Sequence, residues 1–399
     1  MTIQRNSFEL QRKQQQVKEW GAVEELKTKA AAVTPLIDES IADPAIFARN
    51  GLKEVVHRQQ NGAHAVEIPA EFVLPPHLQP GLSAKGDHIA LNLPLIDMSG
   101  VYDNPERRKQ IAASIDDACR NWGFFQVVGH GVPEELRQRI LSLGREFFNL
   151  PVSEKAKWTG EQKNLPIAKP SLGKSRTTSS GHQSWRDLFR HRIDPVRDAE
   201  VNEWPTTPKF YRETMMEYTR ATTKLTTTLF ELMSEGLNLS SQHIHQSVGG
   251  AENLDHVIML ANYPRCPQPD LALGIIGHTD PNLLTLVIQD DVGLEVKKDG
   301  FWIPVVQAYN GFVVNIGDSL QIMTNDMYTS AEHRVVTNAK RDRISAMVFV
   351  QPQNHVNVGV MSDVVPTNKT AIYKAISWSE HLKYAKKGLD NKLTELARK

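Results

Sequence analysis

Three side chains that suit a metal ion lie in the second half of the chain. His278 and Asp280 are separated by one threonine, and His333 follows 55 residues later. Two imidazoles and one carboxylate form the facial ligand set that binds iron(II) and leaves positions open for other ligands. If residues 278–280 form a strand, positions i and i+2 point to the same face, so both side chains could reach one ion.

Each part of this pattern is weak when taken alone. With 14 histidines and 46 acidic residues, about one or two His-x-acid pairs are expected by chance. A lone histidine beside a strand, such as His333, is more often structural than a ligand, so a solvated pair of surface histidines is the alternative at this stage. His243 and His245 form another i, i+2 pair, but no acid lies nearby and we expect a solvated loop there.

A second candidate group begins at Arg343. As a strand, the run Arg343–Pro352 would place Arg343, Ser345 and Phe349 on one face and only aliphatic side chains on the other. A guanidinium that points into a core needs a partner, and a dicarboxylate cosubstrate would supply one because arginine binds a carboxylate as a two-pronged donor. Tyr263 could donate its hydroxyl to the same molecule. The alternatives are an arginine that reaches solvent and an ordinary core tyrosine.

Short apolar runs dominate the chain from 257 to 352 and must position these side chains. They are separated by Gly, Asp and Asn at the spacing of an antiparallel β-sandwich or barrel. The runs are 257–260, 284–289, 293–298, 301–305, 311–316, 333–336 and 344–350. We therefore expect three regions, namely a helical and extended extension at 1–92, a mixed α/β region at 93–250, and a mainly β core with a C-terminal helix at 251–399.

Outside the core, the pattern predicts flanking helices with one apolar face and a few short strands. Helices are expected at 11–29, 107–122, 133–150, 208–237 and 378–396, and strands at 93–97, 123–128 and 185–193. Residues 157–184 are rich in Ser, Thr, Gly and Lys and lack apolar periodicity. They are expected to form a long surface loop, which in a folded domain often acts as a lid.

Composition argues against several broad classes of function. The 46 basic and 46 acidic residues balance, which disfavours a broad nucleic-acid surface. Two cysteines, Cys119 and Cys266, are too few for a disulfide framework or a Cys-rich zinc site. We find no run typical of a signal peptide or a membrane span, and expect a cytoplasmic protein. The phosphate-binding P-loop, the dinucleotide glycine fingerprint and the G-x-S-x-G motif are also absent.

Several ordered motifs resemble those of the plant-type iron(II)- and 2-oxoglutarate-dependent dioxygenases. The resemblance covers roughly residues 93–386 of the chain. Its motifs are LPLID at 93–97, WGFFQVVGHG at 122–131, YPRCPQPDLALG at 263–274, HTD at 278–280, GFVVNIGD at 311–318, HRVV at 333–336 and RIS at 343–345. One departure is Asn262-Tyr263-Pro264, where the family often has Asn-Tyr-Tyr-Pro.

The resemblance implies a double-stranded β-helix, or jelly roll, flanked by helices. It implies three iron(II) ligands, His278, Asp280 and His333, and three side chains that bind or assist with 2-oxoglutarate, Arg343, Ser345 and Tyr263. 2-Oxoglutarate would take two of the three open metal positions and leave one for O2, with ascorbate as the reductant. We expect a monomer whose partners are O2 and a small molecule.

Within the family, the stretch from His278 to Asp290 looks most like the flavonoid enzymes flavanone 3-hydroxylase and flavone synthase type I. That similarity implies a planar phenolic substrate, such as a flavanone, hydroxylated or desaturated at C2 or C3. The side chains expected at its site are Phe349, Leu188, Arg190 and Met259. Phe349 could stack on a planar ring, and Arg190 could bind a phenolate or carbonyl oxygen.

Other interpretations stay open. The same fold could act on a non-flavonoid plant metabolite or hormone. A related oxidase could keep the iron ligands but take electrons from ascorbate or from its own substrate. A non-catalytic β-barrel binding protein is the alternative from another class, although the complete ligand set with Arg343 and Ser345 argues against it.

Overall fold

Two main β-sheets, a two-stranded sheet of β13 and β14, and surrounding helices form the part of the chain that the computed structural model describes. This part comprises residues 67–81, 92–156, 158, 171–174, 181–196, 198–365, 370–385 and 393–399. The helix expected at 11–29 and most of the extension expected at 1–92 lie outside these residues. The strands are β1 (Leu95–Asp97), β2 (Phe124–Val128), β3 (Ser171–Lys174), β4 (Asp187–Asp194), β5 (Leu254–Tyr263), β6 (Leu273–His278), β7 (Leu284–Gln289), β8 (Leu294–Lys298), β9 (Phe301–Pro304), β10 (Phe312–Ile316), β11 (His333–Val336), β12 (Arg343–Pro352), β13 (Asn357–Val358) and β14 (Ile376–Ser377).

The larger sheet has eight strands in the order β1-β2-β10-β7-β12-β5-β4-β3. Its longest antiparallel pair joins β12 to β5, with Arg343 opposite Tyr263 at one end. β12 alternates as predicted, because Ile344 and Val348 belong to the main core on the helix side and Met347 belongs to a second core. One face of this sheet therefore packs on helices, and the other carries Arg343, Ser345 and Tyr263 together with the predicted substrate residues.

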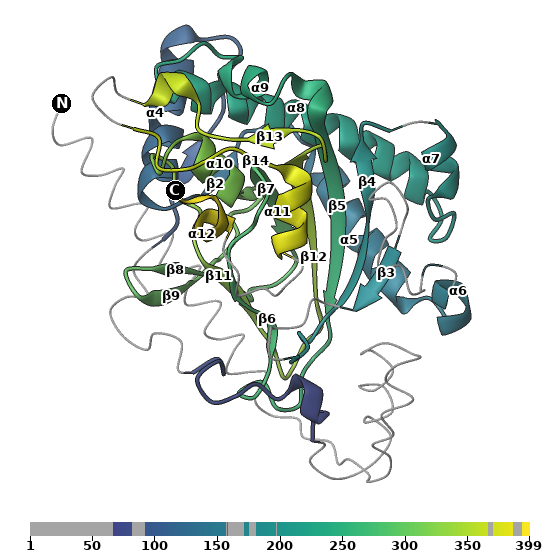
Figure 1. Cartoon of the computed structure of the whole chain (residues 1–399). Coiled ribbons are helices and arrows are strands. Elements are labelled where there is room, and N and C mark those ends of the chain that lie inside the picture. Colours follow the sequence, from purple (N-terminus) through teal and green to yellow (C-terminus); the bar gives the residue numbers. More distant parts are fainter. Residues whose placement is uncertain are drawn as a thin grey trace, which may run out of the picture. The chain divides into compact units, whose positions relative to one another are not determined.

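The smaller sheet has four strands in the order β6-β11-β8-β9 and faces the larger sheet. The second core lies between them, since it combines Ile275 and Val296 from the smaller sheet with Val287 and Val313 from the larger one. Figure 1 shows the smaller sheet beside the long strands β12 and β5. This arrangement confirms the predicted jelly-roll core with flanking helices.

Helices cover the outer face of the larger sheet. The helices are α4 (Pro105–Asn121), α5 (Glu134–Asn149), α6 (Val152–Ala156), α7 (Asp198–Glu203), α8 (Tyr211–Gly236), α9 (His243–Ser247), α10 (Asp318–Met323), α11 (Trp378–Ala385) and α12 (Leu393–Ala397), with 3-10 turns at Ala70–Phe72, Ala251–Asn253 and Ser362–Val364. α4, α5 and α8 bury one apolar face each, for which Ile115, Ile140 and Leu229 are fully buried examples. Asn104 starts α4 by accepting a hydrogen bond from the backbone of Arg107.

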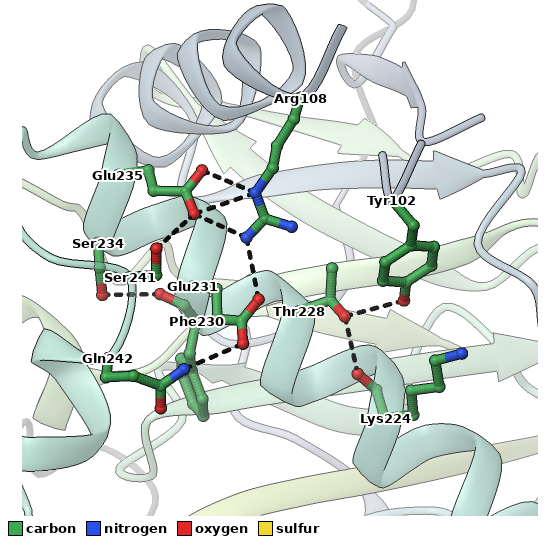
Figure 2. A network of polar contacts seen from close by, with 10 residues as sticks. All are labelled: Tyr102, Arg108, Lys224, Thr228, Phe230, Glu231, Ser234, Glu235, Ser241 and Gln242. Atoms are coloured by element: carbon green, nitrogen blue, oxygen red, sulfur yellow. Dashed lines mark hydrogen bonds and ion pairs between the residues drawn. The ribbon is translucent and has the colours of Figure 1, made fainter. Parts of the chain in front are cut away.

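A polar network fastens α4 to α8 (Figure 2). Arg108 donates to both carboxylate oxygens of Glu235 and to one oxygen of Glu231 at 2.7–3.0 Å. Ser241 and Gln242, just beyond α8, donate to the same two carboxylates. These ion pairs lie on the helix layer, away from the space between the sheets, so their role is to join the two helices.

Two local predictions are wrong. Residues 171–174, expected in a loop, form β3, which pairs with β4 although its sequence has no apolar alternation. His245, expected in a solvated loop, is buried in α9 against Phe230. The helix expected at 378–396 is observed at both of its ends, as α11 and α12, and residues 386–392 between them lie outside the described part.

The predicted regions 93–250 and 251–399 share one sheet. β4 comes from the first region and β5 from the second, and the two strands pair antiparallel over seven registered positions. The space between the sheets is therefore lined by both regions. Within the described residues, every helix is too short or too polar to cross a membrane.

Four buried histidines should make the fold sensitive to acid. Burial is the main cause that lowers the pKa of His130, His191, His256 and His381 from 6.5 to about 4. Between these values the unfolded chain binds protons that the folded chain does not, so stability falls as the pH falls from 6.5 toward 4. We expect urea denaturation to show this loss. His191→Gln should make the slope shallower, and a flat stability over this interval would contradict the assignment.

Candidate active site

The two predicted histidine ligands meet on adjacent strands of the smaller sheet. His278 ends β6, His333 begins β11, and the two residues are paired in the register. Asp280 lies two residues beyond the end of β6, in a non-strand segment. The strand argument for a shared face is therefore wrong for Asp280, although the predicted meeting of the three side chains is observed.

The geometry of these three side chains suits one metal ion. The Nε2 atoms of His278 and His333 each lie 3.8 Å from Oδ1 of Asp280, and one ligand atom from each residue falls within a 4.8 Å cluster. A separation of 3.8 Å is too long for a hydrogen bond, but two atoms can both reach an ion between them through bonds of about 2.1 Å. All three side chains are at most 10% exposed.

Hydrogen bonds fix which atom of each side chain faces the others. Nδ1 of His278 lies 2.9 Å from the Ile276 carbonyl, and Nδ1 of His333 lies 3.2 Å from the Ala331 carbonyl. A carbonyl only accepts, so each Nδ1 carries the proton and each Nε2 offers a lone pair. Burial and the neighbouring His333 lower the pKa of His278 to about 3, which keeps this imidazole neutral.

The carboxylate of Asp280 is held by hydrogen bonds to one of its two oxygens, Oδ2. Its Oδ2 accepts hydrogen bonds from Thr285 Oγ1 at 2.7 Å and from Asn315 Nδ2 at 2.8 Å. Although burial acts to raise it, the pKa of Asp280 is lowered by both histidines and by these two donors. Sequence reasoning missed Thr285 and Asn315. The available signal was a polar residue among the apolar residues of each strand, Thr285 in β7 and Asn315 in β10.

Arg343 fits a carboxylate ligand. It is buried, with Nε bonded to the Asp291 carbonyl at 3.0 Å and Nη2 bonded to Gln289 at 2.6 Å. Its Nη1 is also buried but has no hydrogen-bond partner among the described residues. A buried guanidinium atom without an acceptor is costly, and one carboxylate oxygen would satisfy it. This orphaned donor is what the predicted 2-oxoglutarate site requires.

Tyr263 and Ser345 lie beside Arg343, as predicted. The Arg343 guanidinium stands 4.7 Å from the centre of the Tyr263 ring, and Ser345 is fully buried on the same face of β12. Gly274 permits this packing, since a Cβ there would lie 2.6 Å from the Tyr263 ring. Asn262, the neighbour of Tyr263, points to the opposite face, and both its side-chain polar atoms are buried without a hydrogen-bond partner in the described part of the chain.

Arg186 is a second arginine of the site that sequence reasoning missed. It is buried, and its Nη1 lies 3.4 Å from the Tyr263 hydroxyl. Although burial opposes the change, Arg186 and Arg343 lower the pKa of Tyr263, and Arg186 also contributes to the lowered pKa of His278. Arg186, just before β4, therefore places a positive charge near both Tyr263, in the group around Arg343, and His278, in the group of metal-ligand candidates.

The four predicted substrate residues lie on the same inner face of the larger sheet. Leu188, Met259 and Phe349 pack in or against the second core. Arg190 pairs across the sheet with Met259. Its side chain is solvent-exposed, yet the surrounding protein lowers its pKa by desolvation, and none of the described residues forms a hydrogen bond or ion pair with it. An anionic group could therefore bind there.

Comparisons with known proteins agree with this geometry. A model of the 2OG-Fe(II) oxygenase superfamily matches residues 254–352. A second model, described as non-haem dioxygenase in morphine synthesis N-terminal, matches residues 93–207. The two matches include the residues of both sheets that surround the site.

Individual relatives cover most of the chain. Jasmonate-induced oxygenase 4 of Arabidopsis thaliana is 33% identical over 316 residues, which are 79% of this chain and 88% of the relative. Flavanone 3-dioxygenase 2 of Oryza sativa subsp. japonica is 35% identical over 320 residues, 79% of this chain and 89% of the relative. The crystal structure of JOX2 in complex with 2OG, Fe, and JA has a TM-score of 0.76 at 30% identity, over 90% of this chain and 98% of that one. Relatives with different names match about equally well, so the flavonoid branch stays a prediction.

Proposed function

Because this chain belongs to the 2OG-Fe(II) oxygenase superfamily and is an iron- and 2-oxoglutarate-dependent dioxygenase, we propose that it hydroxylates or desaturates a small planar phenolic, with a flavanone as the first candidate. Its iron ligands are His278, Asp280 and His333. The observation that carries the ligand assignment is the convergence of Asp280 Oδ1 and two unprotonated Nε2 atoms.

The chain's own residues bind and orient the reactants. When bound, iron(II) and 2-oxoglutarate supply the activation of O2 that oxidises the substrate and releases succinate and CO2. Arg343 binds the distal carboxylate through its orphaned Nη1, and Ser345 and Tyr263 add hydroxyl groups beside it. The apolar second core keeps water away from the reacting atoms.

The position of Arg190 supports an extended substrate with an acidic or phenolic oxygen. Arg190 on β4 is three strands from Thr285 on β7, roughly 14 Å across the sheet at about 4.8 Å per strand. A molecule that reaches from Arg190 toward the iron ligands must span much of this distance, as the linked rings of a flavanone would. Phe349, on the same inner face, offers an aromatic surface for stacking.

A second candidate substrate is a carboxylic acid such as jasmonic acid. Two observations favour it: Arg190 has no partner among the described residues, and the similar JOX2 structure was determined with JA. A carboxylate binds arginine through two parallel hydrogen bonds, more strongly than a neutral phenol does.

The test is incubation of the protein with iron(II), 2-oxoglutarate, ascorbate and either naringenin or jasmonic acid, followed by mass spectrometry. We expect an oxidised product from naringenin. Arg190→Leu should raise the KM for the accepted substrate by roughly 10- to 150-fold, the loss expected for one charge-assisted hydrogen bond. Arg139→Leu, which removes an exposed charge on α5 that pairs with Glu217, is the matched control and should leave the KM unchanged.

The outcomes separate the two substrate classes. Oxidation of jasmonic acid alone would replace the phenolic proposal with the carboxylic acid. If neither compound is oxidised or bound in calorimetry, both substrate proposals fail while the dioxygenase assignment stands. An unchanged KM in Arg190→Leu would remove Arg190 from the substrate site.

A further inference from the structure

Asp280 differs from its two partner ligands in how tightly it is restrained. Each histidine has one hydrogen bond that sets its ring, whereas a single oxygen of Asp280 receives two. Both donors come from neighbouring strands of the larger sheet, β7 and β10, in which Thr285 pairs with Asn315. The carboxylate is therefore fixed by the sheet opposite to the one that carries the histidines.

One of the two donors to Asp280, Thr285, is itself held in place by a neighbouring side chain. The Asn282 side-chain amide donates to Thr285 Oγ1 at 3.1 Å and to the Leu284 carbonyl at 2.7 Å, which leaves the Thr285 proton directed to Asp280. Thr285, Asn282 and Asn315 are each at most 2% exposed. The groups that hold Oδ2 are therefore shielded from solvent.

We propose that Thr285 and Asn315 are positioning residues that restrict Asp280 to binding the metal through Oδ1 alone. This inference rests on the proposed ligation of iron by Asp280. A carboxylate can bind a metal through one oxygen or through both. With Oδ2 saturated by two donors, only Oδ1 faces the Nε2 atoms of His278 and His333. We call the two hydrogen bonds from Thr285 and Asn315 to Oδ2 the clamp. The clamp preserves an open metal position that a second carboxylate oxygen would fill.

The experiment measures binding of Co(II) alone to the metal-free full chain, and then the ratio of substrate oxidised to succinate formed with iron(II). Thr285→Val, Asn315→Leu and the double variant remove the donors. We expect each single variant to weaken Co(II) binding by about 10-fold or more, within the roughly 10- to 100-fold range for outer-shell partners. The ratio of product to succinate should fall as well.

Two controls separate positioning from a general packing defect. Thr285→Ser keeps the hydroxyl and should restore both readouts. Thr222→Val removes an equally buried hydroxyl that bonds only to backbone carbonyls within α8, so it should leave Co(II) binding and the ratio unchanged even if stability falls. Where the double variant does not fold, the two single variants decide.

The proposal is overturned if folded Thr285→Val and Asn315→Leu bind Co(II) within twofold of the wild-type chain and keep its product ratio. Asp280→Ala distinguishes this failure from failure of the proposed function. If Asp280→Ala loses Co(II) while both donor variants keep it, only the clamp is wrong. If Asp280→Ala binds Co(II) normally, the ligand assignment itself fails and the clamp fails with it.

Discussion

His333→Ala is expected to abolish metal binding and turnover while leaving the protein folded. The substitution removes one of the three proposed ligand atoms from a site that no other described His, Cys, Asp or Glu completes. Loss of a hydrogen-bonding partner outside the ligand set costs roughly 10- to 100-fold in metal affinity or activity, so loss of a ligand should exceed that. The measurement is iron(II) binding together with CO2 release from labelled 2-oxoglutarate.

His355→Ala is the matched control for this prediction. His355 is an exposed histidine that lies 3.2 Å from Asn253, on the loop after β12. It should retain full metal binding and turnover, and circular dichroism should show the same fold for both variants. Full activity in His333→Ala would refute the metal assignment.

The ligand types could be predicted from the sequence, but their geometry could not. Spacing and residue type identified His278, Asp280 and His333, yet the periodic argument for Asp280 failed because β6 ends at His278. Asp280 is instead positioned by hydrogen bonds from Thr285, five residues further along the chain, and from Asn315, 35 residues further. The backbone at Gly317 also lies close to the backbone at Asn282, near Asp280. Only glycine fits there, since a Cβ at Gly317 would lie 2.0 Å from the Asn282 carbonyl oxygen. Neither effect leaves a local periodic pattern.

Regular alternation was the part of the fold that the sequence predicted well. β12 has two chemically different faces, so its inner residues were identified before the strand's partners were known. β3 was missed because its residues lack such a contrast and the strand is defined by pairing with β4. Arg186 was missed for a related reason. It precedes β4, and only the packing of β4 against β5 brings it beside Tyr263.

Arg343→Ala is expected to raise the half-saturating concentration of 2-oxoglutarate sharply. Truncating one partner of a buried charged pair costs about 2–5 kcal/mol, which corresponds to roughly a 30- to 5000-fold change in binding. Ser345→Ala should be milder, because it removes a neutral hydroxyl. Arg343→Lys should lie between the wild type and Arg343→Ala, since an ammonium keeps the charge but not the two-pronged geometry.

Arg341→Ala provides the control, because Arg341 carries the same charge two residues away but is exposed and pairs with Asp291. Arg343 also donates to the Asp291 carbonyl and to Gln289, so its removal will lower stability. Thermal unfolding of each variant must therefore be measured beside its 2-oxoglutarate binding in the presence of Mn(II). A loss of stability with unchanged 2-oxoglutarate binding would mean that Arg343 only supports the strand. A loss of binding in a variant that remains folded would assign its orphaned Nη1 to the cosubstrate.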